Sequence, residues 1–309
     1  GKISTDMIIM SVGVKPETTI AQNAGITLNP KGSIKVTPEM KTSDENIYAV
    51  GDAVEVIDFN TKKPSFVPLA GPANKQGRIA ADNICGINSS YNGTQGSAVI
   101  KIFDMTVAMT GMNEKTARNM GSNYDKVFTF SASHASYYPG ASNMSVKTIF
   151  DKITGKILGA QIVGFDGVDK RCDVFSTVIR LGGTAKDLTT LELCYAPPFG
   201  SAKDPVNMAG FVIENQMNGI ISNFHWHDVE NLPRDGSVTL LDVRTKREVD
   251  TGKIDGFINI PLDNLRDNLN KLDKSKPVYV HCHSGLRSYI ACRILTGNGF
   301  ISHNLSGGV

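Results

Sequence analysis

The hydrophobic and polar positions of the chain divide into three blocks with different patterns. In the first block, residues 6–12 and 47–50 are short apolar runs, which are typical of buried strands, and residues 32–37 alternate as a short strand would. Residues 72–85 place apolar side chains at helical spacing, and Gly86 ends that helix. The first block is therefore predicted to contain short buried strands followed by one helix.

The second block follows a stretch rich in Gly, Ser and Asn at residues 87–97, which is typical of a domain boundary. Its apolar positions mix the periods of strands and helices, which predicts an α+β domain. The predicted strands are residues 98–103, 105–110, 126–132, 145–150 and 157–163, and the predicted helices lie near 113–120 and 169–182.

The third block begins after a second boundary near residues 215–222. Short apolar runs at 238–244, 257–261 and 278–282 precede a helical pattern at 288–297. Strands that alternate with helices indicate a small parallel α/β domain. The chain is thus predicted to be a multidomain protein of α/β and α+β type. Its domains are expected at residues 1–92, 93–216 and 217–309.

Composition and charge exclude several classes of partner. The chain has 309 residues and a net charge of +2, so neither a nucleic acid nor a membrane surface is expected as a partner. No apolar run approaches the roughly 20 residues that span a bilayer, and the opening segment does not resemble a secretory leader, so the protein is expected in the cytoplasm. Because the chain starts with Gly1 before an apolar run and stops at Val309 where another element should follow, we expect a fragment cut at both ends.

The cysteines are scattered, which argues against a disulfide framework or a zinc ribbon. Their number is odd, and no two have the spacing of a Cys-x-x-Cys motif. This usage fits a reducing compartment. The five cysteines are Cys85, Cys172, Cys194, Cys282 and Cys292.

The strongest chemical signal is the segment that starts at His281 and Cys282 and continues to Arg287. A β-branched strand leads into it and a helix follows, so backbone N–H groups and the helix dipole are expected to meet at one point. A thiol there is expected to react as an accessible thiolate, while Gly285 relaxes the turn and Arg287 binds an anionic sulfur donor. The six-residue Cys-x4-Arg loop is one residue shorter than that of cysteine phosphatases, and it fits a terminal sulfur atom. The predicted product is a persulfide on Cys282.

Residues around this loop resemble the signatures of the rhodanese family. Asp242-Val-Arg244 follows the first strand of the third block, and Glu248 comes four residues later. Residues 256–261 (GFINIP) are similar to the second signature of that family.

The resemblance to rhodaneses covers roughly residues 222–309. Gly307-Gly308 stands where the last rhodanese helix should begin. The resemblance implies a sulfur-carrier domain that uses Cys282. The alternative is an inactive rhodanese fold with a buried structural cysteine. Cys292, inside the predicted helix, is expected in the core.

Two phrases of the first block, IYAVGDAV and PLAGPANKQGRIAADNI, resemble the second FAD-binding signature of flavoproteins with two dinucleotide-binding domains. The resemblance implies that Asp52, after Gly51, accepts a hydrogen bond from a ribityl hydroxyl of FAD. A carboxylate at the end of a parallel strand also faces the crevice where dinucleotides bind. The resemblance places Pro68, Leu69 and Ala70 beside the flavin ring, with the N-terminus of the next helix facing its pyrimidine side.

The second block resembles the dimerisation domain of pyridine nucleotide–disulfide oxidoreductases, in the branch of coenzyme A-disulfide reductases and NADH oxidases and peroxidases. The resemblance implies a homodimer formed through residues 93–216. The phrases that carry it are KIFDMTVAMTGMNE, HASYYPGA, ILGAQIVGFDGVDKR and LELCYAPPFGSAKDPVNMAG.

Tyr195 is the candidate catalytic residue of this block. The resemblance implies that it assists at the disulfide site of the partner subunit, and a phenol near a leaving thiolate can donate a proton. The two prolines that follow would stiffen its loop. The alternative role is packing at the interface. His134, Tyr137 and Tyr138 are expected to serve packing or the interface rather than catalysis.

Two other groups have plainer expected roles. His225-Trp226-His227 places two histidines on one face of a strand, but no third ligand is near in the sequence, so no metal site is expected. Lys203 and Asp204 are expected to form an ion pair at the dimer seam.

Several parts of the resembled family are missing from the chain. It has no Gly-x-Gly-x-x-Gly fingerprint for FAD, no glycine-rich turn for NADH and no redox cysteine after a first βα unit. In the family all three lie upstream of the matching segment. For the complete protein the resemblance implies FAD, NADH or NADPH, and coenzyme A as substrate or ligand.

The expected function is that of an NAD(P)H-dependent reductase of coenzyme A disulfide, persulfide or polysulfide. Electrons would pass from NADH through FAD to an upstream cysteine. One alternative is an NADH oxidase or peroxidase with an appended sulfurtransferase, and another is a non-catalytic dimerising sulfur-carrier module. The fusion to a thiol carrier favours sulfur chemistry over peroxide chemistry.

Overall fold

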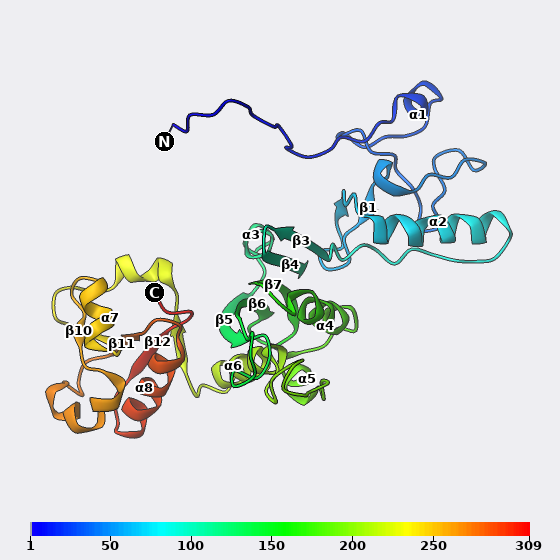
Figure 1. Cartoon of the computed structure of the whole chain (residues 1–309). Helices are drawn as coiled ribbons and strands as arrows, with labels where there is room; N and C mark the ends of the chain where they lie inside the picture. The colour runs from blue at the N-terminus through cyan, green and yellow to red at the C-terminus, as the bar shows by residue number, and fades with distance from the viewer. Residues whose placement is uncertain (1) are drawn as a thin grey trace. The chain divides into compact units, whose positions relative to one another are not determined.

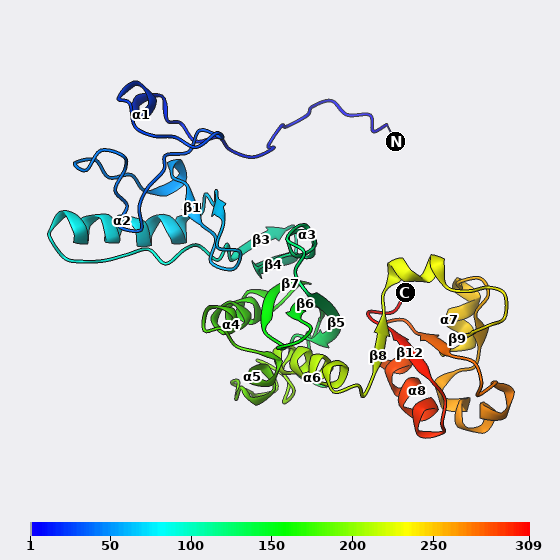
Figure 2. The same ribbon diagram turned by 180° about the vertical axis from the view of Figure 1, so that it is seen from behind.

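The computed structural model describes residues 2–309, and the chain divides into two compact units, one that ends at Gly96 and one that spans Ser97–Val309. Figures 1 and 2 show the elements of both units from opposite sides. The first unit has a small apolar core that includes Ile34 and Val54. Its elements are α1 (Thr19–Asn23), the 3-10 helix η1 (Gly51–Ala53), β1 (Val56–Ile57), β2 (Pro64–Ser65) and α2 (Ala70–Ile84).

The strands predicted for the first unit are wrong. Residues 6–12 are extended without forming a strand, and the side chains of Ile8 and Ile9 are 74% and 83% exposed. A strand needs neighbouring backbone to complete its hydrogen bonds, and no strand of residues 2–309 pairs with this segment. Residues 32–37 and 47–50 contribute isolated bridges instead of strands.

The helix predicted at 72–85 is confirmed as α2. It begins two residues earlier than expected, which leaves Pro72 in the first turn, where a missing N–H is tolerated. Cys85 caps its C-terminal end, and Gly86 follows in the left-handed region with φ 80°.

The first part of the second unit is an antiparallel sheet with the strand order β3-β4-β7-β6-β5, which confirms the predicted α+β domain. Its strands are β3 (Ala98–Ile102), β4 (Met105–Gly111), β5 (Tyr124–Ala132), β6 (Asn143–Asp151) and β7 (Ile157–Gly164). Its helices are α3 (Glu114–Asn119), α4 (Val168–Arg180), α5 (Ala185–Thr190) and α6 (Pro205–Met217). The sequence patterns predicted each of these strands, α3 and α4, but neither α5 nor α6.

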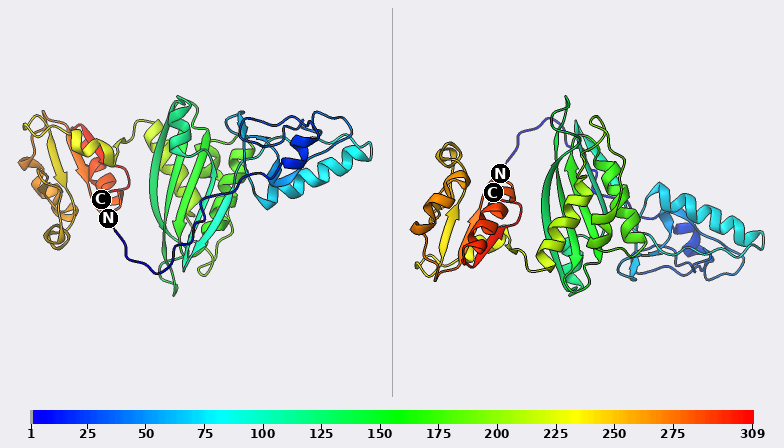
Figure 3. Two further views of the ribbon diagram at one scale, coloured as in Figure 1. Left: turned by 90° about the horizontal axis from the view of Figure 1, so that it is seen from above. Right: turned by 90° about the horizontal axis from the view of Figure 1, so that it is seen from below.

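The two faces of this sheet differ. Helices α4 and α6 pack against one face (Figure 3) and bury a core that includes Val146, Ile162 and Phe175. The residues that alternate with this core on β3, β4 and β7 point the other way and keep partly exposed apolar side chains. They are Ile100, Ile102, Met105, Met109 and Val163.

The C-terminal part of the second unit is a five-stranded parallel sheet with the order β10-β9-β11-β12-β8, which confirms the predicted parallel α/β domain. Its strands are β8 (Ser222–Phe224), β9 (Thr239–Asp242), β10 (Ile258–Asn259), β11 (Val278–His281) and β12 (Ser302–Leu305). Its helical elements are η2 (Trp226–Asn231), α7 (Lys246–Thr251), η3 (Leu262–Asn264), η4 (Arg266–Lys271) and α8 (Leu286–Gly297). Strands β8 and β12 were not predicted.

Candidate functional site

Cys282 lies on the loop between the C-terminal end of β11 and the N-terminus of α8, as the sequence pattern predicts. Gly285 is the N-cap residue of α8, with φ 89°, a conformation that a residue with a side chain adopts only with strain. The backbone N–H of Gly285 donates to Cys282 Sγ at 3.1 Å. The hydroxyl of Ser288 lies 3.3 Å from the same sulfur. The fold thus holds the sulfur at the positive end of a twelve-residue helix.

The sulfur of Cys282 is not accessible in this conformation. The residue is 0% exposed, which contradicts the expectation of an accessible thiolate. The carbonyl of Cys282 is covered as well, because Val309 N donates to it at 3.0 Å. Gly308 lies so close that a Cβ there would come within 2.6 Å of that same oxygen. A sulfur donor therefore reaches Cys282 only when groups around the loop move.

Arg287 is engaged by a carboxylate. Its guanidinium donates two parallel hydrogen bonds to Glu248, at 2.7 and 2.6 Å. Hydrogen bonds from Arg287 and then from Thr245 hold the pKa of Glu248 well below its usual range, and the hydrogen bond to Glu248 raises the pKa of Arg287. Glu248 takes two of the five N–H bonds of the Arg287 guanidinium and pairs its charge, so the expected binding of an anionic sulfur donor by Arg287 stays a prediction.

The Asp242-Val-Arg244 signature stabilises the end of β9. Arg244 donates to Asp242 at 2.8 Å, and both residues are buried. His281 lies opposite Asp242 in the strand register, with 3.4 Å between His281 Nε2 and Asp242 Oδ2. Burial lowers the pKa of His281 despite this carboxylate, so its ring is neutral at pH 7. The strand end that immediately precedes Cys282 is thus paired with the Asp242 end of β9.

The other four cysteines have different environments. Cys172 and Cys292 are buried, and burial raises their pKa to about 11 and about 12, so both thiols are protonated at neutral pH. The expectation that Cys292 lies in the core is confirmed. Cys85 and Cys194 are exposed.

Tyr195 lies on the irregular segment between α5 and α6, and it is half exposed. Its hydroxyl is 3.1 Å from the hydroxyl of Tyr137, and this hydrogen bond raises the pKa of Tyr137. Tyr137 is itself 74% exposed, so it is not packed inside the subunit, and its expected role at the interface stays a prediction. His134 is buried and its ring meets Tyr138 edge-on, which is the predicted packing role. The phrase HASYYPGA was the signal that pointed to Tyr137.

A buried ion pair holds the two segments that carry these tyrosines. Arg171 donates to Asp204 at 2.9 Å and to the carbonyl of Ser133 at 2.9 Å. Asp204 also caps α6 by accepting from Val206 N at 3.0 Å. The predicted ion pair between Lys203 and Asp204 is wrong, because Arg171 and the first turn of α6 use the carboxylate inside the subunit.

The residues expected to hold a flavin lie on η1 and at the start of α2, and these two elements are in contact. Gly51 N donates to Gln76 Oε1 at 2.7 Å, which fixes η1 on α2, and Gly51 has φ 78°. The carboxylate of Asp52 is exposed beside this contact. Leu69 is the N-cap residue, and neither a side-chain cap nor an acidic residue serves the first turn of α2. An exposed carboxylate on η1 and the uncapped N-terminus of the helix that η1 contacts fit a ligand with hydroxyl and anionic groups.

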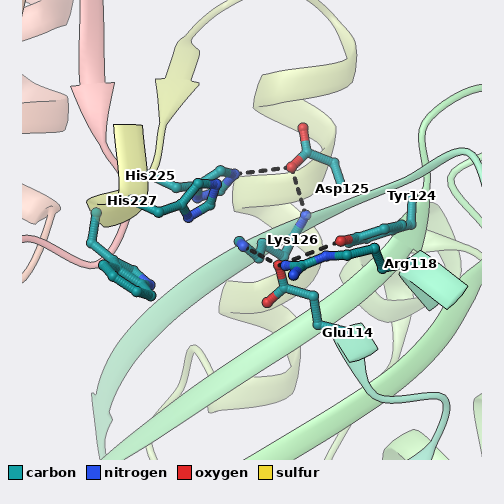
Figure 4. Close-up of a pocket in the computed structure, with 8 residues that line it drawn as sticks. Glu114, Arg118, Tyr124, Asp125, Lys126, His225 and His227 are labelled. Carbon is teal, nitrogen blue, oxygen red and sulfur yellow. Dashed lines mark hydrogen bonds and ion pairs between the residues drawn. The ribbon is translucent and has the colours of Figure 1, made fainter. Parts of the chain in front are cut away.

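A charged pocket of about 530 Å³ lies where the antiparallel sheet meets the parallel domain (Figure 4). His225 Nε2 is 3.1 Å from Asp125 Oδ1, and Gln216 donates to the same carboxylate at 2.6 Å. The rings of His225 and His227 stack. Within residues 2–309 no three His, Cys, Asp or Glu side chains are grouped so that they could hold a metal ion.

Glu114 is the most strongly perturbed acid in this pocket. Burial alone would raise its pKa, but hydrogen bonds from Lys126 and Lys147, the latter at 2.5 Å, lower it to about 2. Glu114→Gln is expected to destabilise the protein by about 2 kcal/mol at pH 7, because buried Lys126 and partly buried Lys147 lose their partner.

The stabilisation that Glu114 provides should depend on pH. An acid with a lowered pKa stabilises the folded state above its ordinary pKa of 4.5, and the contribution is lost as the pH falls through about 2. The difference in melting temperature between the wild type and Glu114→Gln should therefore shrink as the pH falls from 4.5. A difference that stays constant below pH 4 would contradict this assignment. Glu45→Gln, at an exposed position of the first unit, is the control.

Three segments of the chain match models of known protein families. Residues 1–77 match the family model of the pyridine nucleotide-disulphide oxidoreductases. Residues 97–205 match the dimerisation domain of the same family, and residues 225–309 match the rhodanese-like domain. The chain therefore belongs to the pyridine nucleotide-disulphide oxidoreductases, and a rhodanese-like domain follows its dimerisation domain.

Three individual proteins illustrate the similarity. The chain is 36% identical to a coenzyme A disulfide reductase of Staphylococcus epidermidis over 68% of this chain and 48% of the relative. The structure of reduced CoADR-RHD of Bacillus anthracis aligns with a TM-score of 0.94 and 48% identity over 99% of this chain and 55% of that one. An NAD-dependent persulfide reductase from A. fulgidus aligns with a TM-score of 0.86 and 38% identity over 96% and 53%. The predicted resemblance is confirmed, and the chain spans about half the length of these relatives. No helix formed by residues 2–309 combines the length and apolar character that crossing a bilayer requires.

Proposed function

We propose that the complete protein is an NAD(P)H-dependent flavoenzyme that reduces coenzyme A disulfide, persulfide or polysulfide, with Cys282 as a sulfur carrier. The observation that carries the proposal is the Cys282 loop, whose sulfur is held by Gly285 N and Ser288 Oγ at the start of α8. Because the same chain joins this loop to a reductase domain, we infer that the substrate of the reductase contains a disulfide or persulfide sulfur. Such a protein belongs in the reducing cytoplasm, which keeps thiols reduced.

The carrier step moves one sulfur atom without net oxidation. The Cys282 thiolate attacks the terminal sulfur of a persulfide RSS⁻, a new S–S bond forms, and RS⁻ leaves with the electron pair of the broken bond. An acceptor thiolate then takes the terminal sulfur, and Cys282 leaves as the thiolate. The complete reduction, RSSH + NAD(P)H + H⁺ → RSH + H₂S + NAD(P)⁺, transfers two electrons to sulfur.

FAD is the cofactor that the family implies, and the residues present fit it. Asp52 would accept from a flavin hydroxyl, and the segment of Pro68, Leu69 and Ala70 would lie beside the ring at the uncapped N-terminus of α2. When bound, the flavin supplies two-electron transfer between the nicotinamide and a disulfide. Gln76 keeps η1 in place for this role through its bond to Gly51 N.

Tyr195 and Tyr137 are proposed to act as a pair at the disulfide site of the partner subunit. Both hydroxyls are on the surface of the subunit and bond to each other, so a phenol is available to protonate a leaving thiolate. The exposed apolar face that includes Ile100 and Met109 supports a homodimer, because monomers rarely expose such a face.

The products of the complete protein test the proposal. With NADH in excess and oxygen removed, coenzyme A persulfide should yield sulfide and coenzyme A in equal amounts, with one NADH consumed for each. In air, the rate of oxygen or peroxide consumption should stay below about one tenth of that rate. Faster reduction of oxygen or peroxide than of any disulfide or persulfide would instead support an oxidase with an appended sulfurtransferase. If Cys282 takes up sulfur but no NADH is oxidised, the result would instead support a non-catalytic, dimerising sulfur-carrier module.

A further inference from the structure

We propose that Glu248 determines which sulfur donors the Cys282 loop accepts, by cancelling the charge of Arg287 so that dianionic donors such as thiosulfate are disfavoured and organic persulfides are favoured. The inference rests on the proposed role of Cys282 as a sulfur carrier. It adds a specificity-determining residue that acts through Arg287.

The charges around the loop are paired. Arg287 is the only Lys or Arg among residues 282–288, and both of its hydrogen bonds at 2.7 and 2.6 Å go to Glu248. Arg244, the cation on the neighbouring strand end, is neutralised by Asp242 at 2.8 Å. A donor that approaches the sulfur therefore meets no uncompensated guanidinium from either arginine.

Glu248 is held in place from a second side. Its carboxylate accepts hydrogen bonds from the backbone N–H of Thr245 at 3.0 Å and from the hydroxyl of Thr245 at 2.7 Å. These bonds form the capping box of α7, so Glu248 is anchored to its own helix as well as to Arg287. An anion that displaces Glu248 from Arg287 must also compete with an anchored carboxylate.

The charge of the sulfur donor determines how strongly the Glu248 carboxylate repels it. Thiosulfate and the Cys282 thiolate together bring three negative charges to the loop, whereas an organic persulfide and the thiolate bring two. One extra charge within several ångströms of Glu248, in a partly buried site, changes a rate by about tenfold.

The cavity beside the loop has an uncharged lining, which also favours an organic persulfide. Ser284, Gly285 and Leu286 line one side of a cavity of about 180 Å³, and Phe128 and Phe211 line another. None of the residues that line this cavity is charged. An uncharged, partly apolar organic group fits such a lining, whereas the sulfonate end of thiosulfate does not.

Glu248→Gln separates charge from structure. Glutamine still accepts the hydrogen bonds of the capping box, but it carries no charge. Thr245→Ala is the matched control, because it removes the cap and leaves the charge of Glu248 on Arg287. Glu248→Asp keeps the charge, and Glu248→Ala is a second neutral variant.

The test measures persulfide formation on Cys282 in single turnovers of the complete protein, with thiosulfate and with the persulfide of 2-mercaptoethanol as donors. The ratio of the thiosulfate rate to the persulfide rate should rise about tenfold in Glu248→Gln and Glu248→Ala. It should stay within about twofold of the wild type in Thr245→Ala and Glu248→Asp.

The failures of the two proposals are distinguishable. If folded wild-type protein takes sulfur from neither donor, the carrier function itself is refuted. If the wild type reacts with the organic persulfide but the ratio is unchanged in both neutral variants, the role of Glu248 is refuted. A ratio that rises equally in Thr245→Ala would assign the effect to the stability of α7, which also refutes it.

Discussion

Cys282→Ser is expected to lower the rate of sulfur transfer from an organic persulfide to a thiol acceptor by at least about a hundredfold, because a hydroxyl cannot form the persulfide intermediate at neutral pH. Reduction of coenzyme A disulfide by the same variant should change by less than about twofold, because that step is assigned to a cysteine outside this chain. Steady-state rates with both substrates on the complete flavoprotein measure the contrast.

Cys85→Ser provides the matched control for this substitution. Cys85 is an exposed cysteine at the end of α2, so its loss should leave sulfur transfer unchanged. Equal losses of both reactions in Cys282→Ser would mean that the substitution disturbs the fold, and full sulfur transfer without Cys282 would refute its role as the carrier.

Tyr195→Phe is expected to lower kcat for coenzyme A disulfide by about ten- to a hundredfold, because the leaving thiolate loses a proton donor. Tyr137→Phe should have a smaller effect of the same sign, since Tyr137 acts through its hydrogen bond to the Tyr195 hydroxyl at 3.1 Å. Both effects should appear in kcat more than in KM.

Tyr138→Phe is the control for the tyrosine pair. Tyr138 is next to Tyr137 in the sequence, but its ring meets buried His134 edge-on. Its rate should match that of the wild type. If Tyr195→Phe left kcat unchanged in a dimeric protein, Tyr195 would be a packing residue of the interface.

The sequence predicted most of the fold of the second unit, because its patterns are local. The strands of the antiparallel sheet are short β-branched and apolar runs, and the apolar run of β11 leads directly into the Cys282 loop. Helices α5 and α6 were missed although their start signals were present: Thr184 and Asp187 form a capping box, and Pro205 follows the N-cap residue Asp204.

The first unit was predicted less well for a physical reason. An apolar run such as residues 6–12 indicates a strand only where other strands supply hydrogen-bond partners, and the sequence pattern contains no information about those partners. The helix α2 depends on bonds within its own segment, so its prediction succeeded.

The sequence identified the residues of the candidate site, but it did not predict most of their contacts. The position of Cys282 at a helix N-terminus follows from its strand–loop–helix pattern, and the bond from Gly285 agrees with it. The pairing of Arg287 with Glu248 joins residues 39 positions apart, and the spacing within the loop gave no sign of it. Likewise, the burial of Cys282 and the contacts of its carbonyl with Val309 and Gly308 arise only in the folded domain.

The most direct measurement is the mass of the Cys282 peptide after the complete protein has been treated with polysulfide and its thiols have been blocked. An added mass of about 32 Da, one sulfur atom, on Cys282 that disappears when coenzyme A is supplied is the expected result. A folded loop that gains no sulfur, or sulfur that stays on Cys282 with coenzyme A present, would contradict the assignment of Cys282 as the carrier.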